Sequence, residues 1–235
     1  MKLLILAGGF GTRLQHLGFN LPKALVPVGS SPFLELQLQN WMHQGINSFV
    51  FLLHHQADSI SQYLKSIKAG LLAGCELSIV VEKSPLDTGG AIANAVNELS
   101  LTGDFLVVNA DTWLEAGIKD LKNASSPAIA VLHIANGDRF GSVDVDDSGT
   151  VTGFIEKDSS RTDCWISAGM YLLNASLFAA WAGEKVSIER DLFPLLLKEK
   201  QLSAVKIESN FIDIGVPEDY QRFCSWIEDG RSYSL

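Results

Sequence analysis

The chain has few cysteines and no long apolar run, and each shortage excludes a class of protein. Among its 235 residues the three cysteines, Cys75, Cys164 and Cys224, stand far apart. Isolated cysteines form neither the paired spacing of a zinc site nor a disulfide framework, so we expect reduced, inert thiols. No apolar segment approaches the roughly 18 residues of a membrane-spanning helix, and the run at residues 1–7 is too short for a signal peptide. We therefore expect a cytoplasmic protein without a membrane partner.

Charge is also scarce, and its balance is negative. Charged residues make up 19% of the chain, and the net charge is −9. Non-specific binding of nucleic acid needs a basic surface, so nucleic acid is not an expected partner. A bound phosphate must instead be held by glycine loops, single basic residues or metal ions. A hydrophobic content of 47% favours a single globular domain over residues 1–235.

Short apolar runs alternate with helical patterns in the first half of the chain. Strands are predicted at residues 2–7, 49–53, 77–81, 105–108 and 128–133, and helices at residues 33–44, 59–69 and 90–99. Ser59 and Gln62 resemble the capped start of the second of these helices. The alternation predicts an α/β fold with a mostly parallel, mixed central sheet flanked by helices. Ligands of such sheets bind beyond the carboxyl ends of the strands, so the residues after each run are the candidates for a site.

From about residue 139 the pattern becomes richer in β-structure. Strands are predicted at residues 141–146, 151–156, 165–173, 204–208 and 211–214, with a helix at residues 187–199 and a last helix from Pro217. Turn residues at 146–149 separate the first two of these strands. We expect this part to form a small β-rich lobe beside the main sheet.

The first predicted strand leads directly into a glycine-rich segment, Ala7-Gly8-Gly9-Phe10-Gly11-Thr12-Arg13-Leu14. Successive glycines let backbone N–H groups converge on an anion, and the arginine adds a forked cation. A tight turn from strand to helix is the alternative reading of such a segment. A dinucleotide-binding loop would need glycine in place of Leu14, and a P-loop would need a Lys-Ser/Thr ending, which is absent.

This segment resembles the signature L-A-G-G-x-G-T-R-L of sugar-nucleotide pyrophosphorylases, and later segments resemble further motifs of that family. They are Pro22-Lys23-Ala24-Leu25-Val26-Pro27-Val28, Pro85-Leu86-Asp87-Thr88-Gly89-Gly90-Ala91, Asn109-Ala110-Asp111, Phe154-Ile155-Glu156-Lys157 and Phe211-Ile212-Asp213-Ile214-Gly215. The resemblance covers essentially the whole chain. It implies a Rossmann-like nucleotidyltransferase fold, with a nucleotide-binding half at about residues 1–135 and a sugar-phosphate-binding part at about residues 136–215.

The resemblance also implies the reaction: a sugar 1-phosphate oxygen attacks the α-phosphorus of an NTP and releases pyrophosphate. Two anions must be brought together, so catalysis is mainly positioning and charge neutralisation. By resemblance, Arg13 would hold the leaving phosphates, Lys23 the α-phosphate and Lys157 the incoming sugar phosphate. Asp111 and Asp213 would hold Mg²⁺, an ion that one or two carboxylates and substrate phosphates can bind.

The residues alone leave other roles open for the two aspartates. Asp111 could cap a helix, and Asp213 could belong to an ion pair. Because Asp213 stands within an apolar run, its carboxylate needs a partner in either case. Ala110 replaces the glycine that is usual before Asp111 in the family, which adds one methyl group and leaves the carboxylate in place.

Nucleotide contacts are predicted on both sides of the sheet's carboxyl edge. By resemblance they involve the glycine segment and the loop before the third helix: Leu6, Ala7, Gly8, Gly9, Gly11, Thr12, Thr88, Gly89 and Gly90. Asp87 stands where many relatives have glycine, so this loop differs from theirs. The adjacent pair His54-His55 is expected to be structural.

Glu82, directly after the strand predicted at residues 77–81, favours GTP as the nucleotide. Its carboxylate offers two acceptors, which complement the N1–H and N2–H₂ donors of guanine. A uracil or thymine edge would be matched better by a glutamine amide. A contact with the ribose, or a side chain that faces solvent, is the alternative for Glu82.

Sugar-phosphate contacts are predicted for Gly141, Glu156, Lys157, Ser167 and Gly169. Gly141 belongs to an Arg-Phe-Gly element at residues 139–141 that resembles a family motif. Ser167 and Gly169 belong to a segment that resembles the motif N-x-G-x-Y, with serine in place of asparagine. Residues 187–194 resemble the start of a helix in the family.

The compact length and these elements look most like the D-glycero-D-manno-heptose 1-phosphate guanylyltransferases. This resemblance implies GTP and the heptose 1-phosphate as substrates, and GDP-heptose for cell-surface polysaccharide as product. A MurNAc-1-phosphate uridylyltransferase and a mannose-1-phosphate guanylyltransferase are the alternatives. A non-catalytic regulatory subunit would be expected to lack Arg13, Lys23 or a metal aspartate, all of which are present. The sequence leaves a monomer and an oligomer open.

Overall fold

The computed structural model describes residues 1–10, 20–137, 140–155 and 162–230. A nine-stranded sheet runs through this part of the chain in the order β10-β9-β11-β6-β1-β4-β5, and β8 joins β11 to β12. Its strands are β1 (Leu3–Leu6), β4 (Ser48–Leu53), β5 (Glu76–Val81), β6 (Asp104–Asn109), β8 (Ala128–Asn136), β9 (Ser142–Val145), β10 (Val151–Ile155), β11 (Thr162–Asn174) and β12 (Ser203–Lys206). β1 is parallel to β4 and β6, whereas β11 is antiparallel to β6. The predicted mixed α/β sheet is confirmed.

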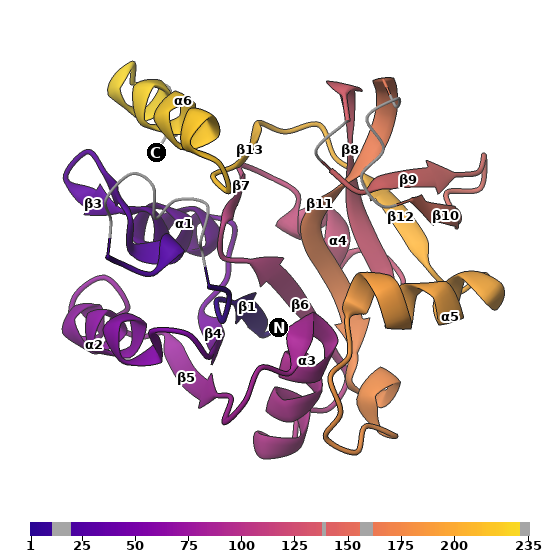
Figure 1. Ribbon diagram of the computed structural model, residues 1–235, viewed down its shortest axis with the longest axis horizontal. Helices are drawn as coiled ribbons and strands as arrows, with labels where there is room; N and C mark the ends of the chain where they lie inside the picture. Colours follow the sequence, from indigo (N-terminus) through magenta and orange to yellow (C-terminus); the bar gives the residue numbers. More distant parts are fainter. Residues whose placement is uncertain (11–19, 138–139, 156–161, 231–235) are drawn as a thin grey trace.

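Helices cover both faces of this sheet. They are α1 (Phe33–His43), α2 (Ala57–Ile67), α3 (Asp87–Glu98), α4 (Ile118–Lys122), α5 (Phe193–Lys198) and α6 (Pro217–Glu228). Because successive strand residues point to opposite faces, Leu3 and Ile5 of β1 pack in the cluster that contains α1 and α2, whereas Leu4 packs in the cluster that contains α3. Figure 1 shows β1 in the middle of the molecule, between α1 and α2 on one side and β8–β12 with α5 on the other. The segment that follows β1 therefore begins at the centre of the molecule.

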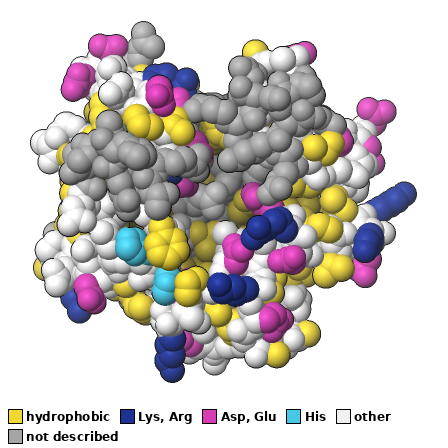
Figure 2. Space-filling model, viewed as in Figure 1, with side chains coloured by type: hydrophobic (Ala, Val, Ile, Leu, Met, Phe, Trp, Pro, Cys, Tyr) yellow, Lys and Arg dark blue, Asp and Glu magenta, His cyan; other side chains and the backbone are white. Residues whose placement is uncertain are grey.

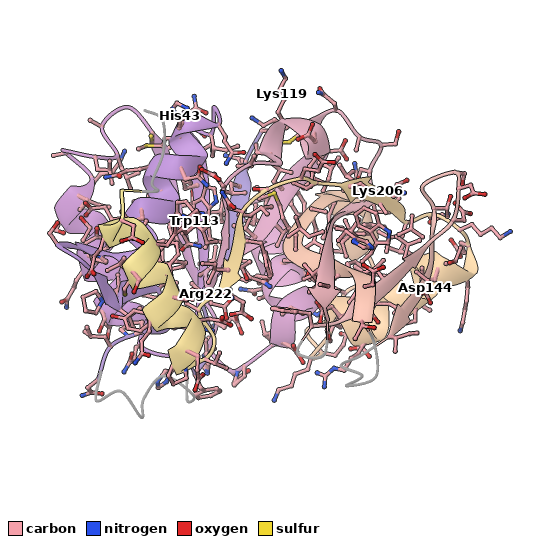
Figure 3. All side chains as sticks on the ribbon, turned by 90° about the horizontal axis from the view of Figure 1, so that it is seen from above. His43, Trp113, Lys119, Asp144, Lys206 and Arg222 are labelled. Carbon is pink, nitrogen blue, oxygen red and sulfur yellow. The ribbon has the colours of Figure 1, made fainter. Side chains whose placement is uncertain are left out.

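A third apolar cluster packs α6 against α1 and the segment that contains Trp113. The Phe223 ring of α6 lies 5.1 Å from that of Phe33 and 5.2 Å from that of Trp113, measured between ring centroids. Figure 3 shows Trp113 beside α6. Trp113 belongs to β7 (Thr112–Leu114), which pairs antiparallel with β13 (Phe211–Asp213). This pairing brings Asp213 close to the residue that precedes Thr112, which is Asp111.

Several predicted boundaries are wrong. The helix predicted at residues 59–69 begins at Ala57, and Gln56, with a left-handed φ of 53°, precedes it in place of the predicted cap Ser59. The helix predicted at residues 90–99 begins at Asp87, and the one predicted at 187–199 is divided into a π-helical turn, Ile188–Leu192, and α5. The remaining short elements are Lys23–Leu25, β2 (Pro27–Val28), β3 (Ser31–Pro32) and Ala175–Phe178.

Within the four described ranges, no helix has both the length and the apolar character that crossing a bilayer requires.

Candidate functional site

The glycine segment leaves the sheet at the carboxyl end of β1, as the sequence predicts. The Ala7 N–H donates to the carbonyl of Leu52 at 3.0 Å, so the segment starts between β4 and β6. A Cβ on Gly8 would lie 3.2 Å from His54 Cβ and 3.4 Å from Glu82 Oε1. Gly8 therefore allows the backbone to pass close to both side chains. The predicted contacts of Gly11, Thr12 and Arg13 lie outside the described residues.

Lys23 and the two predicted metal aspartates form one cluster. Lys23 Nζ lies 2.7 Å from Asp111 Oδ2 and 3.6 Å from Asp213 Oδ1. Asp111 follows β6, Asp213 ends β13, and Lys23 stands in a short 3₁₀ turn. The Lys23 side chain is 13% exposed, whereas those of Asp111 and Asp213 are 37% and 32% exposed. The structure thus brings together three residues that are far apart in the sequence.

Two neighbouring cavities meet at Asp111. One, of about 300 Å³, lies between the glycine segment and the lysine cluster, where Gly9, Lys23, Asp111 and Gly215 contribute to its wall. The other, of about 390 Å³, extends towards β5, where Glu82 lines it together with Gly9 and Asp111. Leu6, predicted to contact the nucleotide, lines both cavities, and Ala7 lines the first. An extended ligand could therefore lie across the carboxyl edge of the sheet with Asp111 near its middle.

The donor set at this cluster fits a magnesium ion. The carboxylates of Asp111 and Asp213 converge on the Lys23 ammonium, which takes the position of a cation between them. Within the described residues no group of three or more His, Cys, Asp or Glu side chains could hold a metal. Mg²⁺ is usually held by one or two carboxylates together with waters and substrate phosphates, so two aspartates suffice.

Glu82 lies at the far end of the second cavity as a nearly buried carboxylate. The residue is 8% exposed, and its Oε2 accepts a hydrogen bond from the Leu86 N–H at 2.8 Å. Burial raises the pKa of the Glu82 carboxyl, although the Leu86 hydrogen bond acts in the opposite direction. The other oxygen, Oε1, faces Gly8, so one acceptor is directed towards the glycine segment. The predicted alternative of a side chain that faces solvent is wrong.

His54, for which the sequence predicts a structural role, lines the same cavity as Glu82. Its Nδ1 lies 3.3 Å from the Glu82 carbonyl oxygen. The ring of Phe10, which is 55% exposed, lies 6.1 Å from the His54 ring and 5.0 Å from the His55 ring, between centroids. Figure 2 shows histidine and hydrophobic side chains gathered on this face of the molecule. The signal that could have found His54 is its place directly after β4, at the edge where ligands of such sheets bind.

Thr88, Gly89 and Gly90 connect α3 to the segment before the π-helical turn. Both glycine N–H groups donate to the Val186 carbonyl, at 2.7 Å for Gly89 and 3.0 Å for Gly90. Thr88 Oγ1 accepts from the Ile188 N–H at 2.9 Å, and Thr88 also lines the second cavity. The nucleotide contacts of the glycines stay a prediction, and their N–H groups already have protein partners.

Three of the residues predicted to contact the sugar phosphate are described by the structure. They lie on β11 or directly before β9. Gly169 has φ +66°, and a Cβ there would lie 2.7 Å from Asn109 Nδ2, so glycine lets β11 approach the segment that carries Asp111. Ser167 Oγ accepts from the Gly169 N–H at 3.3 Å. A Cβ on Gly141 would lie 3.0 Å from the Phe154 ring, which shows that Gly141 is closely packed. Glu156 and Lys157 lie outside the described residues.

A buried tyrosine and a glutamate extend this side of the site. Tyr171 is 2% exposed, and its hydroxyl donates to Glu189 Oε1 at 3.1 Å and lies 3.5 Å from Ser167 Oγ. Burial, together with the charge of Glu189, holds the pKa of Tyr171 well above its usual range, so the hydroxyl stays protonated. Glu189 was not among the predicted site residues, although the helix-start motif at residues 187–194 contains it.

Comparisons with known proteins identify the family of the chain. Residues 2–229 match the family described as nucleotidyl transferase. A D-glycero-alpha-D-manno-heptose 1-phosphate guanylyltransferase from Campylobacter jejuni is 34% identical over 95% of this chain and 98% of its own. The catalytic subunit beta of a mannose-1-phosphate guanylyltransferase from Drosophila pseudoobscura is 31% identical over 93% of this chain, but over only 60% of its own length. The crystal structure of HddC from Yersinia pseudotuberculosis complexed with GMP-PN covers 96% of this chain and 99% of its own, with 29% identity and a TM-score of 0.81.

Proposed function

Since the chain belongs to the nucleotidyl transferase family and is a sugar-1-phosphate nucleotidyltransferase, we propose that it transfers GMP from GTP to D-glycero-D-manno-heptose 1-phosphate. The products are GDP-heptose, a precursor for cell-surface polysaccharide, and pyrophosphate. The relative from Campylobacter jejuni, a guanylyltransferase for this sugar phosphate, supports the proposal because it matches over nearly the full length of both chains.

The observation that carries the proposal for GTP is the nearly buried carboxylate of Glu82 in the cavity next to Asp111. A nearly buried carboxylate needs hydrogen-bond donors, and guanine offers two of them on one edge. Leu86 N–H satisfies one oxygen, and the second is directed towards the glycine segment. A uracil edge, with one N–H between carbonyl oxygens, would place an acceptor against this carboxylate.

In the proposed reaction the protein supplies positioning and charge. Lys23, which is largely enclosed, neutralises the charge that builds on the α-phosphate during in-line attack. Arg13 binds the leaving phosphates and Lys157 the sugar phosphate, as the family resemblance implies. Asp111 and Asp213 would hold Mg²⁺, which supplies further charge neutralisation when it is bound. No enzyme nucleophile is needed, because the sugar phosphate itself attacks.

In this proposal the sugar lies on the side of Asp111 opposite to the base. Gly169 brings β11 against Asn109, and Ser167 and Glu189 surround the buried hydroxyl of Tyr171. A carboxylate and a hydroxyl at this place suit the hydroxyl groups of a sugar ring. The described groups do not select a heptose over a hexose, so that choice depends on the similarity to the heptose enzyme.

Pyrophosphate release tests the proposal. The purified protein with Mg²⁺ is given each of four NTPs with heptose, mannose, glucose or MurNAc 1-phosphate, and the products are identified by mass. We expect release with GTP and the heptose 1-phosphate, and a product with the mass of GDP-heptose. Turnover of mannose 1-phosphate alone would transfer the assignment to that sugar, and UTP with MurNAc 1-phosphate alone would refute the guanine and heptose assignments together. Binding of GTP without any turnover would indicate a regulatory subunit.

A further inference from the structure

The ammonium of Lys23 lies where a divalent cation would bind the two aspartates. Its nitrogen is 2.7 Å from Asp111 Oδ2 and 3.6 Å from Asp213 Oδ1. Mg²⁺ binds carboxylate oxygens at about 2.0–2.1 Å, so an ion bridging Asp111 Oδ2 and Asp213 Oδ1 would take the place of the ammonium. The two cations repel each other at such distances, so each weakens the binding of the other to these oxygens.

The local backbone holds Lys23 in this position. Lys23 begins a 3₁₀ turn, and the N–H of Leu25 closes this turn by donating to the Pro22 carbonyl at 2.8 Å. Asp213 Oδ1 is fixed from the other side by the Gly215 N–H at 2.7 Å. A Cβ on Gly215 would lie 3.0 Å from Lys23 Nζ and 2.8 Å from Asp213 Oδ1, so the backbone approaches both charged groups closely. The ammonium is thus seated between two carboxylates rather than directed to solvent.

We propose that Lys23 is the resident counter-ion of Asp111 and Asp213 in the free enzyme, and that it prevents a divalent cation from binding until a nucleoside triphosphate arrives. This inference rests on the proposed function, because it takes the triphosphate as the ligand. Lys23 and the two aspartates together carry a net charge of −1, and a divalent cation added to all three would change it to +1. A triphosphate offers the ammonium a new anionic partner and offers the cation further oxygen ligands.

The order of binding follows from this exchange. The metal enters with the nucleotide, and the Lys23 ammonium moves from the carboxylates to the α-phosphate in the same event. Lys23 is then in place to neutralise the transition state only when substrate is present. The free enzyme is also protected from holding a metal ion without its nucleotide, since the carboxylates are already neutralised in part.

Metal binding without nucleotide tests the proposal directly. Mn²⁺ is titrated into wild-type protein, Lys23→Gln and Lys23→Met, and unbound Mn²⁺ is measured by electron paramagnetic resonance. Both variants should bind Mn²⁺ at least about tenfold more tightly than wild type, because a competing positive charge is removed from the carboxylates. Adding Asp111→Asn to Lys23→Gln should remove this gain. The matched control is Lys119→Gln on α4, a lysine that Figure 3 shows extending away from the protein into solvent, and it should bind Mn²⁺ as wild type does.

Equal Mn²⁺ affinity in wild type and in folded Lys23 variants would overturn the proposal. If circular dichroism shows that the variants do not fold, the wild-type protein still provides a test. Mn²⁺ alone should leave its melting temperature unchanged, whereas Mn²⁺ with a non-hydrolysable GTP analogue should raise it beyond the analogue alone. An equal rise with Mn²⁺ alone would overturn the proposal. Failure of the proposed function is seen separately, as absence of pyrophosphate release, and leaves the Mn²⁺ titration without nucleotide interpretable.

Discussion

Asp87 and Arg190 form an ion pair with 2.6 Å between Oδ2 and Nη2, which joins the start of α3 to the π-helical turn. Asp87 has φ 63°, a left-handed value that favours glycine, and its Oδ1 accepts from the Thr88 N–H at 2.8 Å. The aspartate therefore offsets its backbone strain with two side-chain interactions. The same position lines the cavity that contains Glu82, so the ion pair links the wall of this cavity to the π-helical turn.

Substitutions at Asp87 separate strain from pairing. Asp87→Gly loses both interactions but relieves the left-handed strain, so its free energy of unfolding should stay within about 1 kcal/mol of wild type. Asp87→Ala loses the interactions and keeps the strain, so it should be less stable than Asp87→Gly by about 1–2 kcal/mol. Urea unfolding measures both values. Equal stability of the two variants would show that the backbone is not strained at this position.

A methyl group at Gly169 should disturb both stability and catalysis. Gly169→Ala adds left-handed strain and places a Cβ 2.7 Å from Asn109 Nδ2, so we expect a loss of about 2–4 kcal/mol and a reduced kcat. The control is Gly103→Ala, since Gly103 has φ +70° and no atom of the described residues lies within 4 Å of its Cβ position. It should lose only about 1–2 kcal/mol, from strain, and keep its kcat. Equal effects of the two substitutions would contradict the close approach of β11 to Asn109.

The sequence predicts the order of strands and helices better than it predicts where the helices begin. The apolar run of β1 followed by glycines locates the turn at the carboxyl end of this strand, because both features are local. The start of α2 differs from the prediction because Gln56, which precedes the helix, adopts a left-handed conformation. A glutamine in the sequence does not indicate such a conformation. β7, with three residues, is too short to show an alternating pattern, whereas β13, of the same length, is marked by the motif at residues 211–215.

Contacts between distant residues are the other part that the sequence leaves open. Motifs predict that Lys23, Asp111 and Asp213 act at one site, but the seating of the ammonium between the carboxylates depends on the pairing of β7 with β13. The packing of Phe10 against His54 depends in the same way on the neighbouring positions of β1 and β4. Such pairings are tertiary and have no local signal.

Glu82→Gln tests whether this carboxylate reads the base. The single oxygen of glutamine can still accept from the Leu86 N–H, but the amide then places N–H donors against the donors of guanine. The ratio of kcat/KM for GTP to that for UTP should fall by about 10- to 100-fold, as expected when one buried hydrogen bond is lost. Glu76→Gln, an exposed change on β5, the strand that Glu82 directly follows, should leave the ratio unaltered. An unchanged ratio in Glu82→Gln would refute base reading by this side chain.

The same carboxyl predicts a pH dependence. Burial raises the pKa of Glu82, so the acid form that cannot accept two hydrogen bonds appears at higher pH than for an ordinary glutamate. KM for GTP should therefore rise as pH falls towards this raised pKa, and the rise should be absent in Glu82→Gln. For stability the sign is opposite: the folded state holds the proton more tightly than the unfolded chain, so ionisation of Glu82 lowers the free energy of unfolding as pH rises. A KM that is independent of pH across the acid range would contradict this assignment.

Tyr171→Phe tests the sugar side. The substitution removes the hydroxyl that donates to Glu189, so KM for the sugar 1-phosphate should rise about tenfold, while KM for GTP stays within about twofold. Tyr63→Phe is the matched control, because Tyr63 also donates to a glutamate, Glu35, but on helices away from the sugar side. It should change neither KM. An equal rise in both KM values of Tyr171→Phe would indicate a structural role only.

In the proposed reaction the nucleotidyl group passes directly from GTP to the sugar phosphate at the cluster of Lys23, Asp111 and Asp213. The decisive measurement follows GTP labelled at the α-phosphorus, with heptose 1-phosphate and Mg²⁺, in wild type and in Asp111→Asn. We predict that wild type moves the label into GDP-heptose with none on the protein, and that Asp111→Asn stays folded but is at least about 10²-fold slower. Near-normal transfer by Asp111→Asn, or label bound covalently to the protein, would contradict the account.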